Sequence, residues 1–131
     1  MKVTAIGKYQ VLGTCRRVSP VLSRLGDKWT VLVITALREN PRRFNEIKRM
    51  VDGISQQMLT RTLKSLERDG AVRRTIFSTN PPQVRYELTE FGRSLSVPLL
   101  ALGQWVVDHL DEIERSQRRF DQKTRSSTVM V

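Results

Sequence analysis

Apolar residues recur at helical spacing in two consecutive segments near the middle of the chain. Residues 43–51 place apolar side chains on one face and charged side chains on the other, as in a short amphipathic helix. Asp52-Gly53 favours a turn, and from Ser55 a second apolar stripe continues to Asp69-Gly70, a pair typical of a helix end. The Ser55 hydroxyl can cap this second helix. The pattern therefore predicts a helix, a tight turn and another helix.

The segments on either side of this pair predict a buried helix and a β-hairpin. The run Trp29–Leu37 is apolar and follows Asp27, a suitable N-cap, so we favour a helix over a strand. Residues 71–77 are rich in β-branched side chains, and residues 84–88 alternate apolar with charged side chains. The loop 78–83 between them contains two prolines and should be stiff and exposed. This hairpin is predicted to form a wing beside the two helices.

A last apolar stripe recurs at steps of three and four residues along 90–114, with Thr89 before it as a helix cap. Pro98 should kink or divide this helix. The stripe extends too far for the core of one small domain, so we expect it to pair with a second copy of the chain. Trp105 either lines a ligand pocket between the copies or packs in their interface, and we favour packing. This C-terminal apolar stripe comprises Leu95, Leu99, Leu102, Trp105, Val106, Leu110 and Ile113.

Charge is distributed unevenly along the chain. The 131 residues include 39% hydrophobic and 27% charged residues, the size and composition of one domain that folds in water. The net charge of +10 favours a polyanionic partner. Residues 38–75 contain ten basic and five acidic side chains, whereas residues 76–114 contain two basic and six acidic ones. The basic middle and the acidic, apolar last helix are therefore expected to have different roles.

Together these elements predict a mainly α fold with a small β-hairpin (α+β), a winged helix-turn-helix DNA-binding domain over residues 15–114. Dimerisation helices are expected at about 15–25 and 90–114. We expect a flexible arm at 1–14 and a frayed basic tail at 115–131.

Other classes of protein have little support in the sequence. There is no apolar run of signal-peptide or membrane-spanning length, so we expect a cytoplasmic, nucleoid-associated protein without a membrane partner. Phosphate-cradling glycine loops, paired carboxylates and nucleophile–base pairs are not recognisable, which argues against an enzyme. One cysteine and one histidine, far apart, give no zinc pattern. No metal or other cofactor is predicted.

The second helix of the central pair carries polar side chains opposite its leucines that suit contacts with DNA. In the major groove Gln can pair with adenine and Arg with guanine, so we predict that Gln57 and Arg61 read base edges. Hydroxyl side chains, Lys64 and wing residues are predicted to hold phosphates. The alternative is an ordinary solvated helix face, but the order of the elements favours double-stranded DNA as the partner. The predicted DNA-binding residues are Arg43, Ser55, Gln56, Gln57, Thr60, Arg61, Lys64, Gln83 and Arg85.

Several separated motifs, in the same order, resemble those of HxlR-type bacterial regulators over roughly residues 15–110. For that family the resemblance implies a winged helix-turn-helix dimer. The helix after Ile54 would enter the major groove, the hairpin loop would touch the backbone or minor groove, and the first and last helices would form the dimer. The motifs that carry the resemblance are Leu25-Gly-Asp-Lys-Trp29, Pro41-Arg-Arg-Phe-Asn-Glu46, Gly53-Ile-Ser-Gln-Gln-Met-Leu-Thr60 with Leu63, Leu66 and Gly70, then Pro81-Pro82, Tyr86, Leu88-Thr89 and Gly92.

Cys15 is the single cysteine of the chain and a candidate redox sensor. It lies fourteen residues before Trp29, the spacing at which several HxlR-type regulators carry a redox-reactive cysteine. Arg16 and Arg17 would favour its thiolate, which is the form that oxidants attack. The alternative is a cysteine that merely packs at a helix start. The sequence departs from the family in having Arg16 where a proline usually follows this cysteine, which leaves the start of the first helix open.

These observations predict a homodimeric transcriptional regulator that binds a pseudo-palindromic operator, with repression favoured over activation. The expected effector is an oxidant or electrophile acting on Cys15, or a noncovalent small molecule at the dimer interface. A second possibility is a winged-helix module that binds RNA or protein without reading bases. Competition with random duplex and single-stranded RNA separates these classes.

Overall fold

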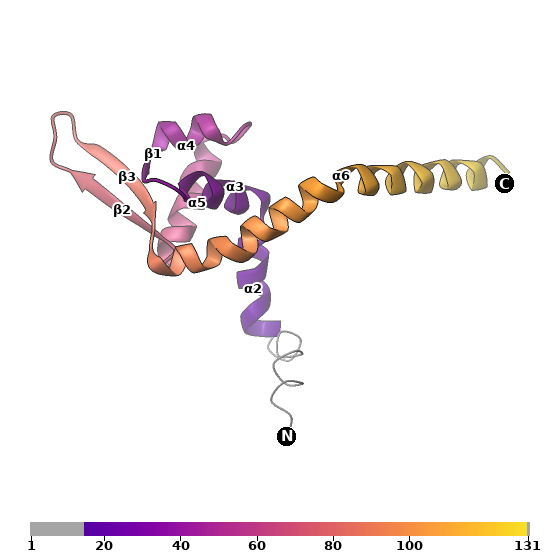
Figure 1. Cartoon of the computed structure of the whole chain (residues 1–131), viewed down its shortest axis with the longest axis horizontal. Helices are drawn as coiled ribbons and strands as arrows, with labels where there is room; N and C mark the ends of the chain where they lie inside the picture. The colour runs from indigo at the N-terminus through magenta and orange to yellow at the C-terminus, as the bar shows by residue number, and fades with distance from the viewer. Residues whose placement is uncertain (1–14, 131) are drawn as a thin grey trace, which may run out of the picture. The chain divides into compact units, whose positions relative to one another are not determined.

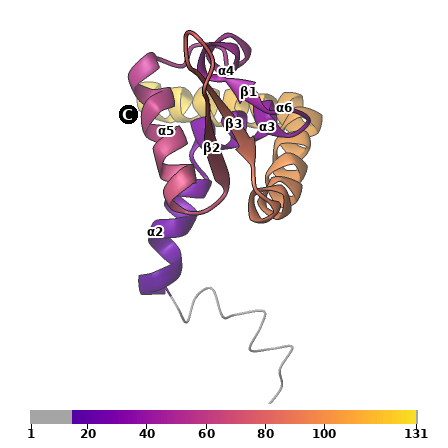
Figure 2. The same cartoon turned by 90° about the vertical axis from the view of Figure 1, so that its left-hand side faces the viewer.

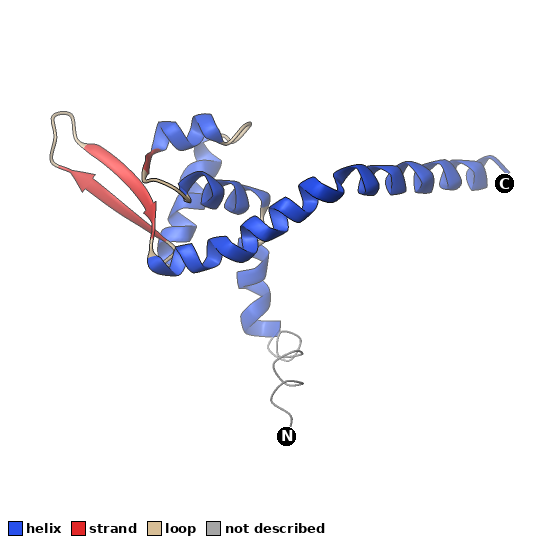
Figure 3. Cartoon of the chain, in the orientation of Figure 1, coloured by secondary structure: helices blue, strands red, loops and turns tan. Residues whose placement is uncertain are grey.

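The structure, a computed structural model, describes the backbone of residues 15–130 and the side chains of residues 16–125. The chain divides into two compact units, the first ending at Ser96 and the second beginning at Val97. Helices dominate, and a hairpin forms most of a small antiparallel sheet (Figures 1 and 3), which confirms the predicted α+β fold class. In chain order the elements are α2 (Cys15–Leu25), α3 (Lys28–Leu37), β1 (Arg42–Arg43), α4 (Phe44–Met50), α5 (Gln56–Arg68), β2 (Val72–Phe77), β3 (Gln83–Leu88) and α6 (Glu90–Met130).

Helix α3 forms the centre of the first unit. Its N-terminus is capped by Asp27, whose carboxylate accepts a hydrogen bond of 3.0 Å from the backbone N–H of Trp29. The β-branched Val33 and Ile34 are completely buried, so tertiary packing outweighs their strand propensity. The apolar run is therefore a helix, as its N-cap and length predict.

Helices α4 and α5 form the predicted helix-turn-helix. Gly53 has a φ of +82°, a backbone conformation that a side chain would strain, and it reverses the chain between the two helices. Ser55 caps α5, because its Oγ accepts a 3.0 Å hydrogen bond from the backbone N–H of Met58. One face of α5 is buried against the core. The buried residues of α5 are Leu59, Thr62, Leu63 and Leu66.

The end of α5 and the start of α6 meet through backbone contacts. Gly70, with a φ of +84°, ends α5, and the N–H of Ala71 donates to the carbonyl of Leu66 at 2.9 Å. The hydroxyl of Thr89 donates to the carbonyl of Gly70 at 2.6 Å and accepts from the N–H of Gly92 at 3.0 Å. A Cβ on Gly92 would overlap the carbonyl oxygen of Ala71. This joint requires glycine at position 92.

The sheet has the strand order β1-β3-β2. Its two-residue strand β1 was not predicted, because it is too short for a period of two to show in the sequence. Residues opposite each other in the hairpin share a face, so its side chains divide into two sets. The inner face, which includes the buried Val72 and Leu88, consists of Val72, Arg74, Ile76, Val84, Tyr86 and Leu88. The outer face consists of Arg73, Thr75, Phe77, Gln83, Arg85 and Glu87.

The last helix is longer than expected, because residues 115–130 continue it where a frayed tail was expected. Of the two outcomes expected at Pro98, a kink or a division, the structure excludes the division, since Pro98 lies inside the single helix α6. The sequence after Gly103 contains neither glycine nor proline and is rich in Glu, Gln, Arg and Lys, which favour helix. Between residues 15 and 130, none of the helices combines the length and the apolar character needed to cross a membrane.

Candidate nucleic-acid interface

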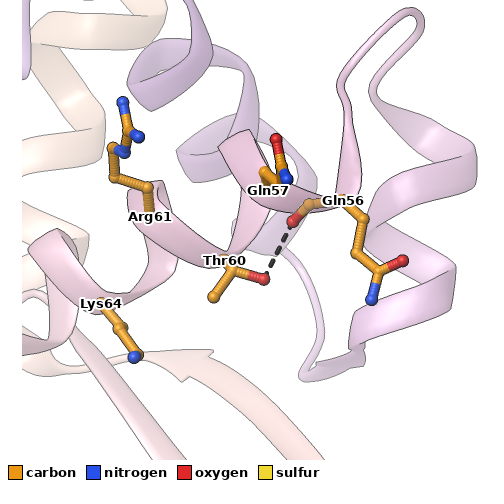
Figure 4. Close-up of a pocket in the computed structure, with 5 residues that line it drawn as sticks. All are labelled: Gln56, Gln57, Thr60, Arg61 and Lys64. Carbon is orange, nitrogen blue, oxygen red and sulfur yellow. Dashed lines mark hydrogen bonds between the residues drawn. The ribbon is translucent and has the colours of Figure 1, made fainter.

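The exposed side of α5 presents a continuous polar surface, which we call the reading face (Figure 4). All its side chains are exposed, and those of Gln57, Arg61 and Lys64 make no hydrogen bond or ion pair with any described residue. Thr60 differs, because its hydroxyl donates a 2.9 Å hydrogen bond to the backbone carbonyl of Gln56. The buried leucines on the opposite side fix the direction of this face. Its residues, which line one surface pocket, are Gln56, Gln57, Thr60, Arg61 and Lys64.

Two further predicted residues lie where helices begin. Ser55 immediately precedes the reading face, and while its Oγ caps α5 its O–H proton remains able to donate. Arg43 precedes α4, where its backbone N–H donates to Glu46 Oε1 at 2.8 Å and its Nε lies 3.5 Å from the same oxygen. The backbone hydrogen bond from Arg43 is the main cause that lowers the pKa of Glu46. Glu46 thus both caps α4 and holds the Arg43 side chain.

The two predicted wing residues, Gln83 and Arg85, lie on the outer face of the hairpin. The Arg85 guanidinium carbon lies 5.0 Å from the centre of the Phe77 ring, in a cation–π contact. Figure 2 shows the hairpin with α5 to one side of it. Gln83 lines a pocket with Arg43 and Glu46, whereas residues of α5 line the pocket on the reading face. The sequence did not reveal this separation because it depends on strand register.

One basic residue that the sequence analysis did not single out lies next to the reading face. Arg74, on the inner face of β2, lines a cleft between α5 and the sheet together with Lys64 and Tyr86. Its neighbour Arg73 points to the outer face and forms a 3.2 Å ion pair with Glu87. The alternation of strand side chains shows that one of the two arginines must face α5, but the sequence alone does not say which.

The C-terminal apolar stripe is partly exposed in the single chain. Leu102 is 53% exposed, Trp105 51%, Leu110 46% and Val106 40%, whereas Leu99 is buried. Leu95 and Ile113 are half-buried. The Trp105 ring stacks on His109 at 4.2 Å between centroids, which uses one aromatic face within the helix itself. Within the described part of the chain, the second unit therefore exposes apolar side chains at four positions of the stripe.

Cys15 is the first residue of α2, and its side chain lies outside the described part of the structure. Arg16 and Arg17, the two predicted neighbours, are exposed. Arg24 near the end of α2 forms a bidentate ion pair with Asp69 at the end of α5, with Nη2 and Oδ1 3.1 Å apart. This pair joins the helix that begins with Cys15 to the helix that carries the reading face.

A helix-turn-helix whose second helix is polar outside, followed by an antiparallel hairpin, defines a winged helix-turn-helix protein. Residues 24–114 match the family model described as HxlR-like helix-turn-helix, and the chain belongs to this family. It is accordingly a DNA-binding transcriptional regulator, and its relatives are transcriptional regulators rather than enzymes.

Individual relatives agree with this assignment. The HTH-type transcriptional regulator YdeP of Bacillus subtilis is 36% identical over 107 residues, which cover 79% of this chain and 84% of YdeP. The structure of the putative transcriptional regulator ytfH from Salmonella typhimurium has a TM-score of 0.72 and 33% identity, covering 76% of this chain and 89% of that one. The redox regulator HypR in its reduced form has a TM-score of 0.69 and 37% identity, covering 76% and 98% respectively.

Proposed function

We propose that this regulator inserts α5 into the major groove of its operator and reads base edges with Gln57 and Arg61. The reading face carries this proposal, because five exposed side chains lie on one face of α5. Most of these side chains make no hydrogen bond with a described residue, and the buried residues of α5 pack behind them. Arg can donate two hydrogen bonds to guanine, and Gln can both donate to and accept from adenine. Gln56, at the start of the helix, is placed where base contacts concentrate in this fold.

The flanking residues would fix the position of the helix on the DNA backbone. Lys64, Ser55 and Arg43 can each donate to a phosphate, and Gln83 and Arg85 of the wing are proposed to reach phosphates beyond the groove. The hydroxyl of Thr60 already donates its proton within α5 and is not free to donate it to a phosphate. We propose instead that the Thr60 methyl group contacts a thymine methyl.

We also propose that the regulator acts as a homodimer in the cytoplasm. The exposed C-terminal apolar stripe supports pairing with a second copy, which would cover it. A twofold dimer would place two α5 helices on half-sites of a pseudo-palindrome about one DNA turn apart. Occupation of such a site would exclude polymerase, so repression is the favoured outcome.

Cys15 is the proposed site of signal detection. The exposed Arg16 and Arg17 beside it would stabilise a thiolate, and the similar protein HypR is described as a redox regulator. An electrophile would add to this sulfur. An oxidant would take two electrons and two protons from the Cys15 thiol and a second thiol, either Cys15 of another copy or a small-molecule thiol, as a disulfide forms. Treatment with a thiol oxidant should change DNA binding by the wild type but not by Cys15→Ser. An equal response of the two proteins would refute this role.

The DNA-reading proposal is tested with duplexes selected from a randomised pool. Arg61→Ala should weaken binding to the selected duplex by about 1–3 kcal/mol and relax the base preference at one position. Arg73→Ala removes the same charge from a side chain that pairs with Glu87, and this control should keep the base preference of the wild type. An equal base preference in Arg61→Ala and Arg73→Ala, at one salt concentration, would remove Arg61 from the interface.

A further inference from the structure

The cleft between α5 and the inner face of the hairpin is the strongest unassigned feature of the first unit. One wall comes from α5 and the other from neighbouring residues of β2 and β3, which lie opposite each other in the sheet. Arg74 and Tyr86 form that second wall as a cross-strand pair. The residues that line the cleft are Thr60, Leu63, Lys64, Glu67, Arg74 and Tyr86.

This cleft is continuous with the reading face. Thr60 and Lys64 line both the pocket on the exposed side of α5 and the cleft beside the sheet. DNA that lies on the reading face would therefore bring one backbone strand to the edge of α5 where the cleft opens. Wing residues on the outer face do not share this surface.

The charges around the cleft suit a single phosphate group. Lys64 and Arg74 are both exposed, and neither forms an ion pair within the described part of the chain. Tyr86 adds a half-buried phenol whose O–H can donate. Glu67 lines the same cleft and opposes an anion there, so the cleft holds two cationic groups and one anionic group.

The adjacent Arg73 is an arginine of the same hairpin whose guanidinium already forms an ion pair. Arg73 lies on the opposite face and is paired with Glu87 at 3.2 Å. Arg74 has the same side chain, on the same strand, but no such partner among the described residues. The difference between the two positions is the face on which each side chain lies.

We propose that this cleft binds a phosphodiester of the DNA backbone, with Arg74 and Lys64 as the cationic ligands and the Tyr86 hydroxyl as a further donor. The inference rests on the proposed function, in which α5 lies in the major groove. It adds Arg74 to the interface as a residue that positions α5 rather than one that reads bases. Glu67 weakens the phosphate contact and limits affinity for all sequences alike.

The test compares Arg74→Ala with Arg73→Ala, which removes the same charge from the opposite face. Affinities are measured for a selected duplex and for a mixed-sequence duplex over a series of salt concentrations. Arg74→Ala should weaken binding to both duplexes by roughly tenfold and make the dependence of log affinity on log salt shallower by about 0.9. Arg73→Ala should change that slope less than Arg74→Ala does, because Arg73 is already paired with Glu87. Equal slopes for the two variants would overturn the proposal.

A second pair of variants tests the effect of removing a negative charge from the cleft. Glu67→Gln should tighten binding to both duplexes, because it removes the carboxylate that faces the phosphate. Glu39→Gln is its control and should not tighten binding, because Glu39 is exposed and lines neither the cleft nor the reading face. If Glu67→Gln behaves like Glu39→Gln, the cleft does not hold a phosphate.

The outcomes also separate this inference from the proposed function. If Arg61→Ala loses base preference while Arg74→Ala matches Arg73→Ala, the reading face stands and the cleft proposal fails. If the wild type shows no preference for any selected duplex, both fail. Loss of affinity for mixed duplex in Arg74→Ala, with base preference intact, is the result that supports both.

Discussion

The reading face of α5 and the C-terminal apolar stripe of α6 are both exposed, and they differ in chemistry. The reading face of α5 consists of amide, hydroxyl and cationic side chains, which water solvates well. The C-terminal apolar stripe on α6 exposes leucine, valine and tryptophan, including Trp105 at 51% and Leu102 at 53%. An exposed apolar stripe is stabilised by being covered, whereas an exposed polar face needs a partner only for function. In the proposed function the two faces therefore select different partners: a polyanion for α5 and an apolar surface for α6.

The largest expected effect is on the apolar face. Val106→Glu should raise the dimer dissociation constant at least about a thousandfold, because each dimer would then bury two unpaired carboxylates. Sedimentation measures the change directly. Val107→Glu is the control, since Val107 is 68% exposed and lies outside the stripe. If Val106→Glu remains as dimeric as Val107→Glu, the two faces do not differ in the way proposed.

The next effect concerns the joint at which α5 ends and α6 begins. Gly92→Ala should lower the free energy of unfolding by about 3 kcal/mol, because the new methyl group overlaps the carbonyl oxygen of Ala71. Gly103→Ala, which meets nothing within 4 Å in the chain, should not destabilise it. Thermal unfolding of the two variants tests whether the joint is as tight as the structure shows. Equal melting temperatures would contradict it.

A smaller effect separates stability from DNA binding on the polar face. Ser55→Ala should cost about 1 kcal/mol of stability, because the N–H of Met58 loses its acceptor. Ser55→Asp restores an acceptor and should recover that stability, yet it places a negative charge beside the phosphates and should weaken DNA binding. Chemical unfolding and duplex binding are measured on both variants. If Ser55→Asp binds DNA as tightly as wild type, Ser55 lies away from the backbone.

The smallest effect is a dependence on pH. The pKa of Glu46 is lowered, chiefly by the backbone N–H of Arg43, so its ionised form stabilises the fold. This contribution is complete above the pKa of the unfolded chain and is lost as pH falls through the lowered value. The stability difference between wild type and Glu46→Gln should therefore shrink on acidification. A difference that stays constant with pH would exclude the Glu46 carboxylate as its source.

Local sequence signals predicted the elements of the first unit well. Asp27, Ser55, Gly53 and Gly70 lie at helix ends where side-chain oxygens and left-handed backbone are required, and each is used there in the structure. The reading face was also predictable, because helical periodicity alone places polar residues opposite buried leucines.

Features that depend on long-range contacts were not predictable in this way. Strand β1 exists only because it pairs with β3, and the choice between Arg73 and Arg74 depends on the register of the hairpin. The continuation of α6 past residue 114 reflects helix propensity, which the pattern of apolar positions does not reveal. The proposed role of Cys15 depends on the groups that surround its thiol in three dimensions, which its position in the sequence does not show.

Recognition of DNA sequence by the reading face can be measured by competition binding. A duplex selected from a randomised pool would compete against mixed-sequence duplex and single-stranded RNA at one salt concentration. We expect at least about a thousandfold preference for the selected duplex, with two related half-sites about one helical turn apart. A ratio near one, or tighter binding to the RNA, would contradict it.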